Sequence, residues 1–323
     1  MNFRNTNLYK EEFEKIVNEL TSVGVKETDA EIVADCFATA DTFGVTTHGI
    51  SILPSHIDRV KRGGYNLSPD FSVLKETPAF ALINGDNAFG PVSARYCLDY
   101  GIKKAKEVGV FTVLGKNNNT FGPAFYYSLK AAEEGLIAIV TSNSPAQMAP
   151  FGGNEKMLGT NPFSAVIPVP DDEPIIIDFA TSVVAKSKFK EYAESGKALP
   201  DGWALDQNGQ PTNDANEGIK GFVLPMAGFK GYGLSMLIDI MSGFLSGSAY
   251  LNKVGRFYSS DNKSMNIGFY MTVIDPKVVL GNEYDEEIKQ YVKILRDSGR
   301  IGENNIILPG DDRINHKNSL LGK

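Results

Sequence analysis

His48 is the residue whose chemistry stands out first, in the triplet Thr47-His48-Gly49. An imidazole has an unperturbed pKa of about 6.5, so it can give or take a proton near neutral pH. The hydroxyl of Thr47 beside it could hold a substrate oxygen. We therefore expect His48 to be a general acid or base, with Thr47 as its companion. From the residues alone, a capping or packing role for this histidine stays open as an alternative.

Lys230 is the second candidate, because glycines flank it in the segment GFKGYG at the start of an apolar helical stretch. The N–H groups and the dipole at a helix N-terminus attract anions, and a lysine there adds positive charge. An anionic diphosphate would suit this place. The alternative is a solvated lysine in a flexible turn.

Turns rich in glycine and asparagine follow several expected strands. Loops at strand ends with free backbone N–H groups suit the recognition of phosphate and amide groups. Ordinary turn chemistry is the alternative, since these residue types dominate turns. The turns are residues 117–119, 142–144, 152–153 and 159–162.

Other familiar chemistries lack their motifs in this sequence. It contains no G-x-G-x-x-G, no P-loop, no G-x-S-x-G elbow and no H-E-x-x-H. Its 3 histidines and 2 cysteines are scattered, so we expect no metal site. A lyase or hydrolase is not favoured either, because no pair of nucleophile and base is visible.

The elements that must position these residues follow from hydrophobic spacing. Phe13, Ile16, Val17 and Leu20 lie on one helix face, and Thr28 with Glu31 has the capping-box pattern of a second helix. A third helix is expected over about 52–61. Strands then alternate with helices, which predicts an α/β sheet. The strands are expected at 80–84, 110–114, 136–141, 163–169, 175–178 and 267–274, with helices at 91–107 and 123–134.

The remaining segments are less regular. Residues 196–218, rich in Asp, Asn, Pro and Gly, predict a long surface loop. The helix over 231–247 is apolar almost all round and should be buried. A charged amphipathic helix over 286–299 precedes an extended ILPGDD segment.

The amino-acid composition excludes some classes of binding partner. Lys and Arg number 32 against 39 Asp and Glu, a net charge of −7, which argues against nucleic acid or an anionic membrane as partner. The N-terminus is polar, and no apolar stretch approaches the roughly 20 residues of a membrane span. Two cysteines cannot form a disulfide framework. We expect a cytoplasmic protein with a small-molecule partner.

Six blocks of sequence, taken in order, make the chain similar to the malate/L-lactate dehydrogenase family of the non-Rossmann type. That family includes sulfolactate and ureidoglycolate dehydrogenases and diketogulonate reductases. The resemblance covers nearly the whole chain. The blocks are GVTTHGISILP, MAPFGGNEKMLGTNPFSAVIP, IIIDFATSVVAKSK, LPDGWALDQNGQPTNDA, FKGYGLSMLIDIMSGFLSG and ILPGDD.

The resemblance implies a fold and a cofactor. The fold is an α/β one, with a non-Rossmann nicotinamide-binding domain over 76–283 and a smaller α-helical domain over 1–75 and 284–323. The cofactor is NAD or NADP, and the assembly is a homodimer. The implied cofactor contacts are Ser144, Asp178, Phe179, Ala180, Thr181, Ser182, Lys230, Gly231, Gly310, Asp311 and Asp312.

The chain departs from the family pattern around the substrate. Ile52 and Phe43 replace arginines, His56 replaces a tyrosine, and Thr120 replaces a second histidine. A buried carboxylate needs a paired cation, so these changes favour a less charged or a larger, more apolar substrate. Arg59 or Lys61, on the same expected helix, could supply the missing charge.

The combined prediction is an NAD(P)-dependent oxidoreductase with His48 as general acid/base. It transfers a hydride between the nicotinamide and a small 2-oxo or 2-hydroxy compound or a cyclic imine, and Ile52, His56 and Thr120 contact that substrate. The rival hypothesis is a dinucleotide-binding homologue that has lost turnover.

Overall fold

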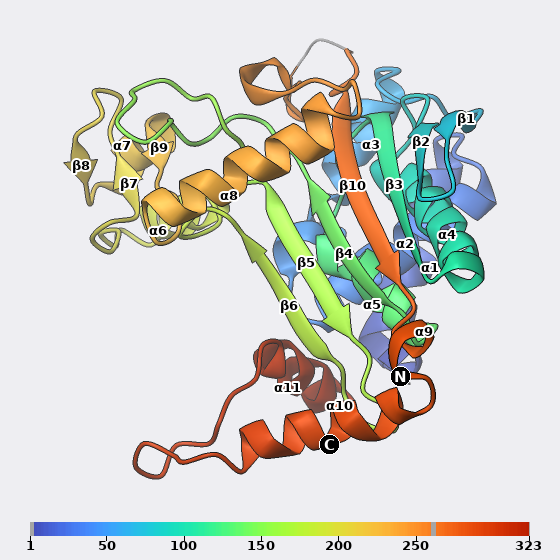
Figure 1. Ribbon diagram of the computed structural model, residues 1–323. Helices are drawn as coiled ribbons and strands as arrows, with labels where there is room; N and C mark the ends of the chain where they lie inside the picture. Colours follow the sequence, from blue (N-terminus) through green and yellow to red (C-terminus); the bar gives the residue numbers. More distant parts are fainter. Residues whose placement is uncertain (1–2, 260–262, 323) are drawn as a thin grey trace.

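A seven-stranded sheet forms the centre of the molecule (Figure 1), in a computed structural model that describes residues 3–259 and 263–322. Its strand order is β1-β2-β3-β10-β4-β5-β6. β2 and β3 pair in parallel, and the other five pairs are antiparallel. A Rossmann sheet is mostly parallel, so the predicted non-Rossmann α/β fold is confirmed. The strands are β1 Ser72–Glu76, β2 Phe80–Asn84, β3 Val110–Asn118, β4 Ile137–Ser142, β5 Pro162–Ile167, β6 Ile175–Ala180 and β10 Ile267–Ile274.

Helices cover one face of this sheet in two layers. α4 (Gly90–Val108) and α5 (Ala124–Glu133) pack on the strands, and α1 (Asn7–Ser22) and α2 (Glu27–Thr42) pack outside them. One hydrophobic core joins the layers, from Ile16, Leu20 and Val33 to Phe111, Val113 and Phe269. The helix faces that the apolar spacing predicted to be buried are therefore buried in this core.

The start of α2 differs from the expected capping box. The helix begins at Glu27, and its N-cap residue Lys26 makes no side-chain capping bond. Thr28 therefore lies inside the first turn, where it cannot cap. α3 (Leu53–Lys61) begins with Pro54 in its first turn, as its sequence predicts.

The predicted long loop over 196–218 is wrong, because this stretch contributes to a small lobe. Asp206 accepts N–H bonds from Asn208 and Gln210 and so forms a tight turn. Asp214 caps the next helix. A small core of Phe189, Leu199, Ala204, Ala215 and Val223 holds the lobe together. Its elements are α6 Ser187–Glu194, β7 Ala204–Leu205, β8 Pro211–Thr212, α7 Ala215–Lys220 and β9 Phe222–Val223.

Helix α8 (Phe229–Asp239), continued by a π-helical turn over Ile240–Phe244, crosses the other face of the sheet (Figure 1). It is not the fully buried helix that its composition predicts. Its small residues Gly231 and Ser235 face inward, where a Cβ on Gly231 would lie 2.1 Å from a backbone oxygen. Ile238 and Asp239 are buried on the same side, whereas Met236, Leu237, Ile240 and Phe244 are exposed.

The C-terminal segment folds back beneath the sheet. α9 (Lys277–Leu280) and α10 (Glu283–Arg296) lead into residues 297–310 and then α11 (Asp311–Leu320). The ILPGDD stretch is therefore extended only until Pro309, since Asp311 and Asp312 begin a helix. The domain boundaries at 75/76 and 283/284 stay a prediction. Within the described residues, no helix combines the length and hydropathy that a membrane crossing requires.

Candidate active site

His48 ends a short 3₁₀ turn, Thr46–His48, that α2 holds in place. The Oδ2 atom of Asp41, near the end of α2, accepts a 2.6 Å hydrogen bond from the backbone N–H of Ile50. A Cβ on Gly49 would lie 1.9 Å from this oxygen, so only glycine fits beside the histidine. The turn that carries His48 is therefore fixed on both sides.

The imidazole of His48 is half-buried, and one of its nitrogens is engaged. A 3.0 Å hydrogen bond joins Nδ1 to the hydroxyl of Thr47. Nε2 forms no hydrogen bond with any of the described residues. The structure thus brings the two predicted catalytic residues together, with the second ring nitrogen open.

Two opposite charges act on this ring. Burial lowers the pKa of His48, the carboxylate of Asp178 on β6 raises it, and the guanidinium of Arg313 on α11 lowers it further. Arg313 Nη2 lies 2.7 Å from Asp178 Oδ2. The net effect favours the neutral imidazole, which is the form that can accept a proton.

Gly310 lies against the same strand, and Asp311 and Asp312 follow it in the first turn of α11. The N–H of Ile176 in β6 donates to the carbonyl of Pro309 at 3.0 Å. Gly310 has φ +92°, and a Cβ there would lie 2.5 Å from the Ile176 Cβ. Asp311 accepts two hydrogen bonds from Arg296, at 2.6 and 2.7 Å, so its carboxylate already has a cation partner.

The start of α8 lies beyond the other end of β6. The N–H of Met226 donates to the carbonyl of Thr181 at 2.9 Å, and the N–H of Gly231 donates to the carbonyl of Met226 at 3.1 Å. Ser182 is buried next to Thr181. Lys230 is exposed, and no described residue forms a hydrogen bond or ion pair with its ammonium group.

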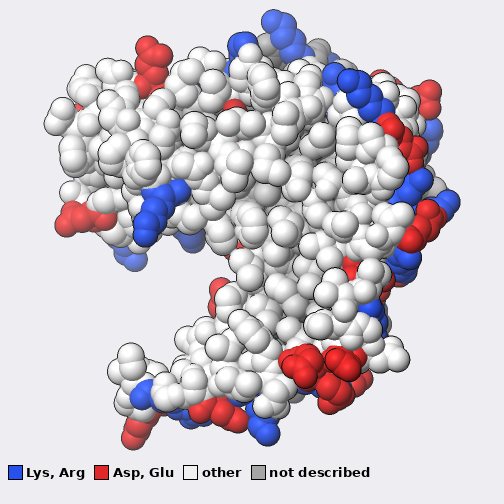
Figure 2. Space-filling model, in the orientation of Figure 1, with Lys and Arg blue, Asp and Glu red and all other residues white. Residues whose placement is uncertain are grey.

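Ser144 and β6 complete this arrangement. The N–H of Ser144 donates to Asn161 Oδ1 at 3.0 Å, and Asn161 donates to the carbonyl of Ser235 in α8 at 2.9 Å. Asp178, Phe179 and Ala180 are half-buried in the edge strand itself. The residues predicted to contact the cofactor are thus found at the start of α11, along β6, and at the start of α8 beyond the end of β6. The space-filling view shows a deep hollow on this side, between the small lobe and α10–α11 (Figure 2).

The predicted substrate residues gather elsewhere. His56 is buried among Phe37, Tyr65, Phe89 and Phe257, and Tyr65 forms a 2.8 Å hydrogen bond with its Nδ1. Burial, and then Arg59, lower its pKa to about 3. It is therefore neutral near pH 7, and its role as a substrate contact stays a prediction.

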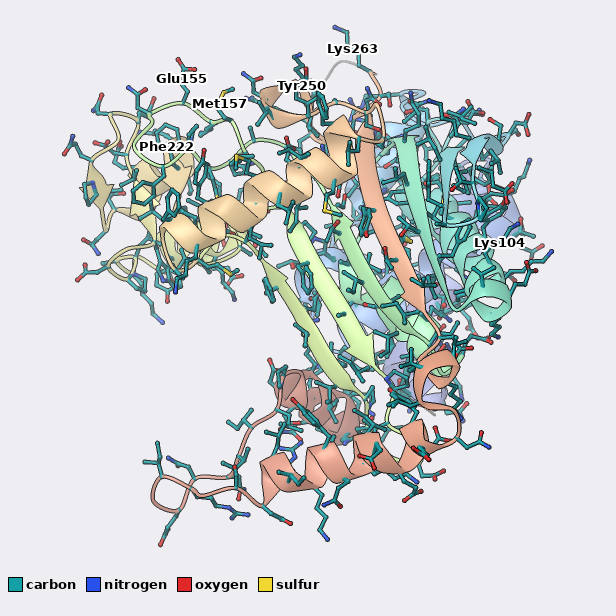
Figure 3. The ribbon with its side chains drawn as sticks, in the orientation of Figure 1. Lys104, Glu155, Met157, Phe222, Tyr250 and Lys263 are labelled. Atoms are coloured by element: carbon teal, nitrogen blue, oxygen red, sulfur yellow. The ribbon has the colours of Figure 1, made fainter. Side chains whose placement is uncertain are left out.

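Arg59 is held in this same cluster. It donates to Asn119 Oδ1 at 3.0 Å and to the carbonyl of Lys263 at 2.7 Å. Lys263 lies at the top of the molecule in Figure 3, at the opposite end from α11. These contacts engage Arg59, which had been a candidate to supply the missing cation.

Ile52 and Thr120 are both half-buried. Ile52 packs against the main core, and the hydroxyl of Thr120 donates to the sulfur of Met265 at 3.2 Å. Phe43, where the family pattern has an arginine, is 1% exposed and packs on Phe125. Among the described residues, no hydrogen bond or ion pair links these positions to Asp178 or Arg313.

Arg313 is the residue of this site that the sequence did not single out. It stands in α11, a helix whose polar sequence DDRINHKNSL carries little amphipathic signal. The one feature of the sequence that could have indicated Arg313 is its place directly after the two acidic residues of ILPGDD. Its partner Asp178 is remote in sequence, so only the fold brings the two together.

Comparison with known proteins places the chain among dehydrogenases. The sequence model described as malate/L-lactate dehydrogenase matches residues 9–321. A malate dehydrogenase from Pyrococcus horikoshii is 40% identical over 88% of this chain and 81% of its own length. The solved sulfolactate dehydrogenase from Methanocaldococcus jannaschii superimposes with a TM-score of 0.90 at 34% identity, over 96% of this chain and 90% of that one. A solved Δ1-piperideine-2-carboxylate reductase from Pseudomonas syringae has a TM-score of 0.89 at 25% identity, over 98% and 95% of the two chains.

Proposed function

Because the chain belongs to the malate/L-lactate dehydrogenase family, an oxidoreductase family, we propose that it is an NAD(P)-dependent dehydrogenase with His48 as its general acid/base. The observation that carries the proposal is the half-buried imidazole, held at Nδ1 by Thr47 and open at Nε2. The same imidazole lies in the field of Asp178, a residue of the proposed cofactor path.

The residues of the chain supply the proton chemistry. During oxidation of a CH–OH group, Nε2 of neutral His48 takes the hydroxyl proton as the C=O bond forms. In the reverse direction, the imidazolium returns this proton to the carbonyl oxygen or to an imine nitrogen. When bound, the nicotinamide accepts or donates the hydride. A positioned proton transfer of this kind contributes about 10²–10⁴-fold to the rate.

The residues along β6 fit a dinucleotide. Lys230 offers a positive charge that has no ion-pair partner among the described residues, in the first turn of α8, where the helix N-terminus also favours a phosphate. At the other end, Gly310 lets the chain lie against Ile176 where a Cβ would clash. Six residues of strand span roughly 20 Å, so the path is elongated as a dinucleotide is. NAD and NADP are both compatible with these contacts.

The substrate class follows from the relatives and from the site together. The relatives include malate dehydrogenases, L-sulfolactate dehydrogenases and a Δ1-piperideine-2-carboxylate reductase. We propose a small 2-hydroxy or 2-oxo compound or a cyclic imine. Because Ile52 places no positive charge four residues after His48, the pocket favours substrates with less negative charge than malate.

We propose further that two copies of the chain associate through the outer face of α8. Met236, Leu237, Ile240 and Phe244 are large, apolar and exposed on this face. Contiguous apolar surface of this kind marks protein interfaces.

The two cysteines are buried and free, which fits a reducing compartment such as the cytoplasm.

The test is the variant His48→Asn, which keeps a polar group of similar size beside Thr47. We expect kcat to fall about 100-fold or more, while NAD(P)H affinity measured by fluorescence stays unchanged. His316→Asn, at an exposed position on α11, is the matched control and should keep kcat within about twofold. Near-normal turnover by the His48 variant would overturn the assignment. Cofactor binding by the wild-type chain without turnover of any carbonyl, hydroxy acid or imine would instead support the non-catalytic alternative.

A further inference from the structure

Arg313 and Asp178 form an ion pair where α11 meets the edge strand β6. Arg313 Nη2 lies 2.7 Å from Asp178 Oδ2 and donates to the backbone carbonyl of Asp178 at 3.2 Å. The two side chains are 19% and 12% exposed. A pair this well shielded is screened little by salt, so its charges act strongly on neighbouring groups.

The rest of the guanidinium is fixed by an aromatic ring and not by further hydrogen bonds. Its Cζ lies 5.0 Å from the centre of the Phe125 ring. Nη1 is buried and has no hydrogen-bond partner among the described residues. A buried, incompletely paired cation destabilises a fold. An apolar residue would pack here at a lower cost in stability. Packing therefore does not explain why the residue at this position is charged.

Helix α11 also lies against the chain that leads into His48. A Cβ on Gly44 would lie 3.3 Å from the ring of His316, and the ammonium of Lys317 lies 5.8 Å from the centre of the Phe43 ring. Gly44 is four residues before His48. The helix that carries Arg313 therefore packs against the strand of Asp178 and against the segment that leads into the turn of His48.

We propose that Arg313 is a positioning residue for the acid/base step: it holds the Asp178 carboxylate beside His48 and offsets its charge there. The proposal rests on the role of His48 proposed above. An unopposed carboxylate beside the ring would stabilise the imidazolium, which cannot take a proton from an alcohol. Burial is the main cause that lowers the pKa of His48, and Arg313 adds to it by offsetting the charge of Asp178, so that the neutral ring can accept a proton.

Other charged groups also face the turn of His48. Asp41 of α2 accepts a hydrogen bond from the N–H of Ile50, and the carboxyl group of Glu12 on α1 interacts electrostatically with Asp41. His316 and Lys317 approach from α11, as described. Among these groups, only the charges of Asp178 and Arg313 shift the pKa of His48. The other groups near the turn can therefore be changed as controls.

The experiment measures the pKa of His48 directly by NMR, with carbon-13-labelled histidine and no cofactor or substrate. With 3 histidines in the chain, each resonance can be assigned by substitution. The variants are Arg313→Gln, which removes the charge, and Arg313→Lys, which keeps it. Lys317→Met is the matched control, because it removes another buried cation of α11 that pairs with Glu173.

We expect Arg313→Gln to raise the pKa of His48 by about one unit, a tenfold change in proton affinity. Arg313→Lys should restore most of the wild-type value, and Lys317→Met should leave it unchanged. The acid limb of the pH profile of kcat/KM for oxidation should move upward with the NMR value. An unchanged His48 pKa in Arg313→Gln, or an equal rise in Lys317→Met, would overturn the proposal. A shifted pKa with an unmoved acid limb would overturn the role of His48 instead, and would leave the effect of Arg313 on the ring established.

Discussion

Ile52 occupies the end of a short 3₁₀ turn, four residues after His48, and leads directly into α3. Its side chain is half-buried and packs against the main core. Substrates that carry a carboxylate need a cation nearby, and Arg59 on the same helix is already bound to Asn119 and to a backbone carbonyl. The identity of residue 52 is therefore expected to influence which substrates bind.

The variant Ile52→Arg tests this expectation. We expect kcat/KM for malate and lactate to rise by about tenfold or more, because a charge-assisted hydrogen bond contributes roughly 1.5–3 kcal/mol. Ile52→Met, which is long and flexible but uncharged, is the control and should show no gain. If Ile52→Arg brings no gain, or if the wild-type chain oxidises malate at more than about 10⁴ M⁻¹s⁻¹, the carboxylate is bound elsewhere.

Among the secondary-structure elements, α8 joins the proposed cofactor site to the outer surface. Its first turn carries Lys230, and its N-cap Gly228 has φ +61°, a conformation that favours glycine. The hydrogen bonds from Met226 to Thr181 and from Gly231 to Met226 connect this turn to the end of β6. The position of the lysine is therefore set by the backbone of two elements.

Replacing this lysine should weaken cofactor binding specifically. We expect Lys230→Ala to raise the dissociation constant of NAD(P)H about tenfold, through the loss of one charge-assisted contact to phosphate. The far-ultraviolet circular dichroism spectrum should not change, because the side chain is exposed. Lys253→Ala removes an exposed lysine beyond the other end of the helix and should leave the affinity as it is. Equal affinities in the two variants would reject the site at the start of α8.

Regular strands and helices could be predicted from local sequence, whereas several other elements could not. The strands at residues 80–84 and 267–274 match the expected limits, because each is a continuous apolar run that lies within the central sheet. Residues 196–218 looked like a loop because polar turns separate very short strands. α11 has little amphipathic signal, and its first turn is stabilised by Arg296, which belongs to another helix.

Some residues of the candidate site could likewise be predicted from local sequence, and others could not. His48 and Lys230 could be proposed from the sequence because each stands beside a glycine, His48 after an expected helix and Lys230 at the start of another. The Arg313–Asp178 pair was not, because the contact depends on how α11 packs on β6 and on no local pattern. The outward face of α8 was also mistaken for a buried one, since composition does not tell which side of an apolar helix has small residues.

At the scale of the whole molecule, the apolar face of α8 predicts the assembly. We expect the wild-type chain to sediment as a dimer and Leu237→Glu to dissociate it, because a charge would be buried at the interface. Leu237 is 50% exposed, so the variant should keep its fold as a monomer. Val279→Glu, on the exposed surface of α9, is the control and should remain dimeric. Sedimentation velocity distinguishes these outcomes, and a wild-type monomer would refute the interface.

Glu12 and Asp41 couple the stability of the whole molecule to pH. Burial, and then the charge of Asp41, raise the pKa of Glu12 from its ordinary value of 4.5 to about 8. The folded protein therefore retains a proton that the unfolded chain releases above about pH 4.5. The stabilisation that this proton provides is complete below that pH, and it declines until the folded protein also releases the proton near pH 8.

Glu12→Gln should therefore flatten the dependence of Tm on pH, because glutamine keeps a polar side chain beside Asp41 but does not titrate. Between pH 6 and 8.5 we expect the wild-type Tm to fall by about 2–4 °C more than that of the variant, since Glu12 is partly exposed and solvent screens its charge. Glu11→Gln, an exposed neighbour on α1, removes the same charge without this contact and should show the wild-type slope. Thermal melts of the three proteins across this range provide the comparison. Parallel slopes for wild type and Glu12→Gln would show that the carboxyl pair does not hold the extra proton.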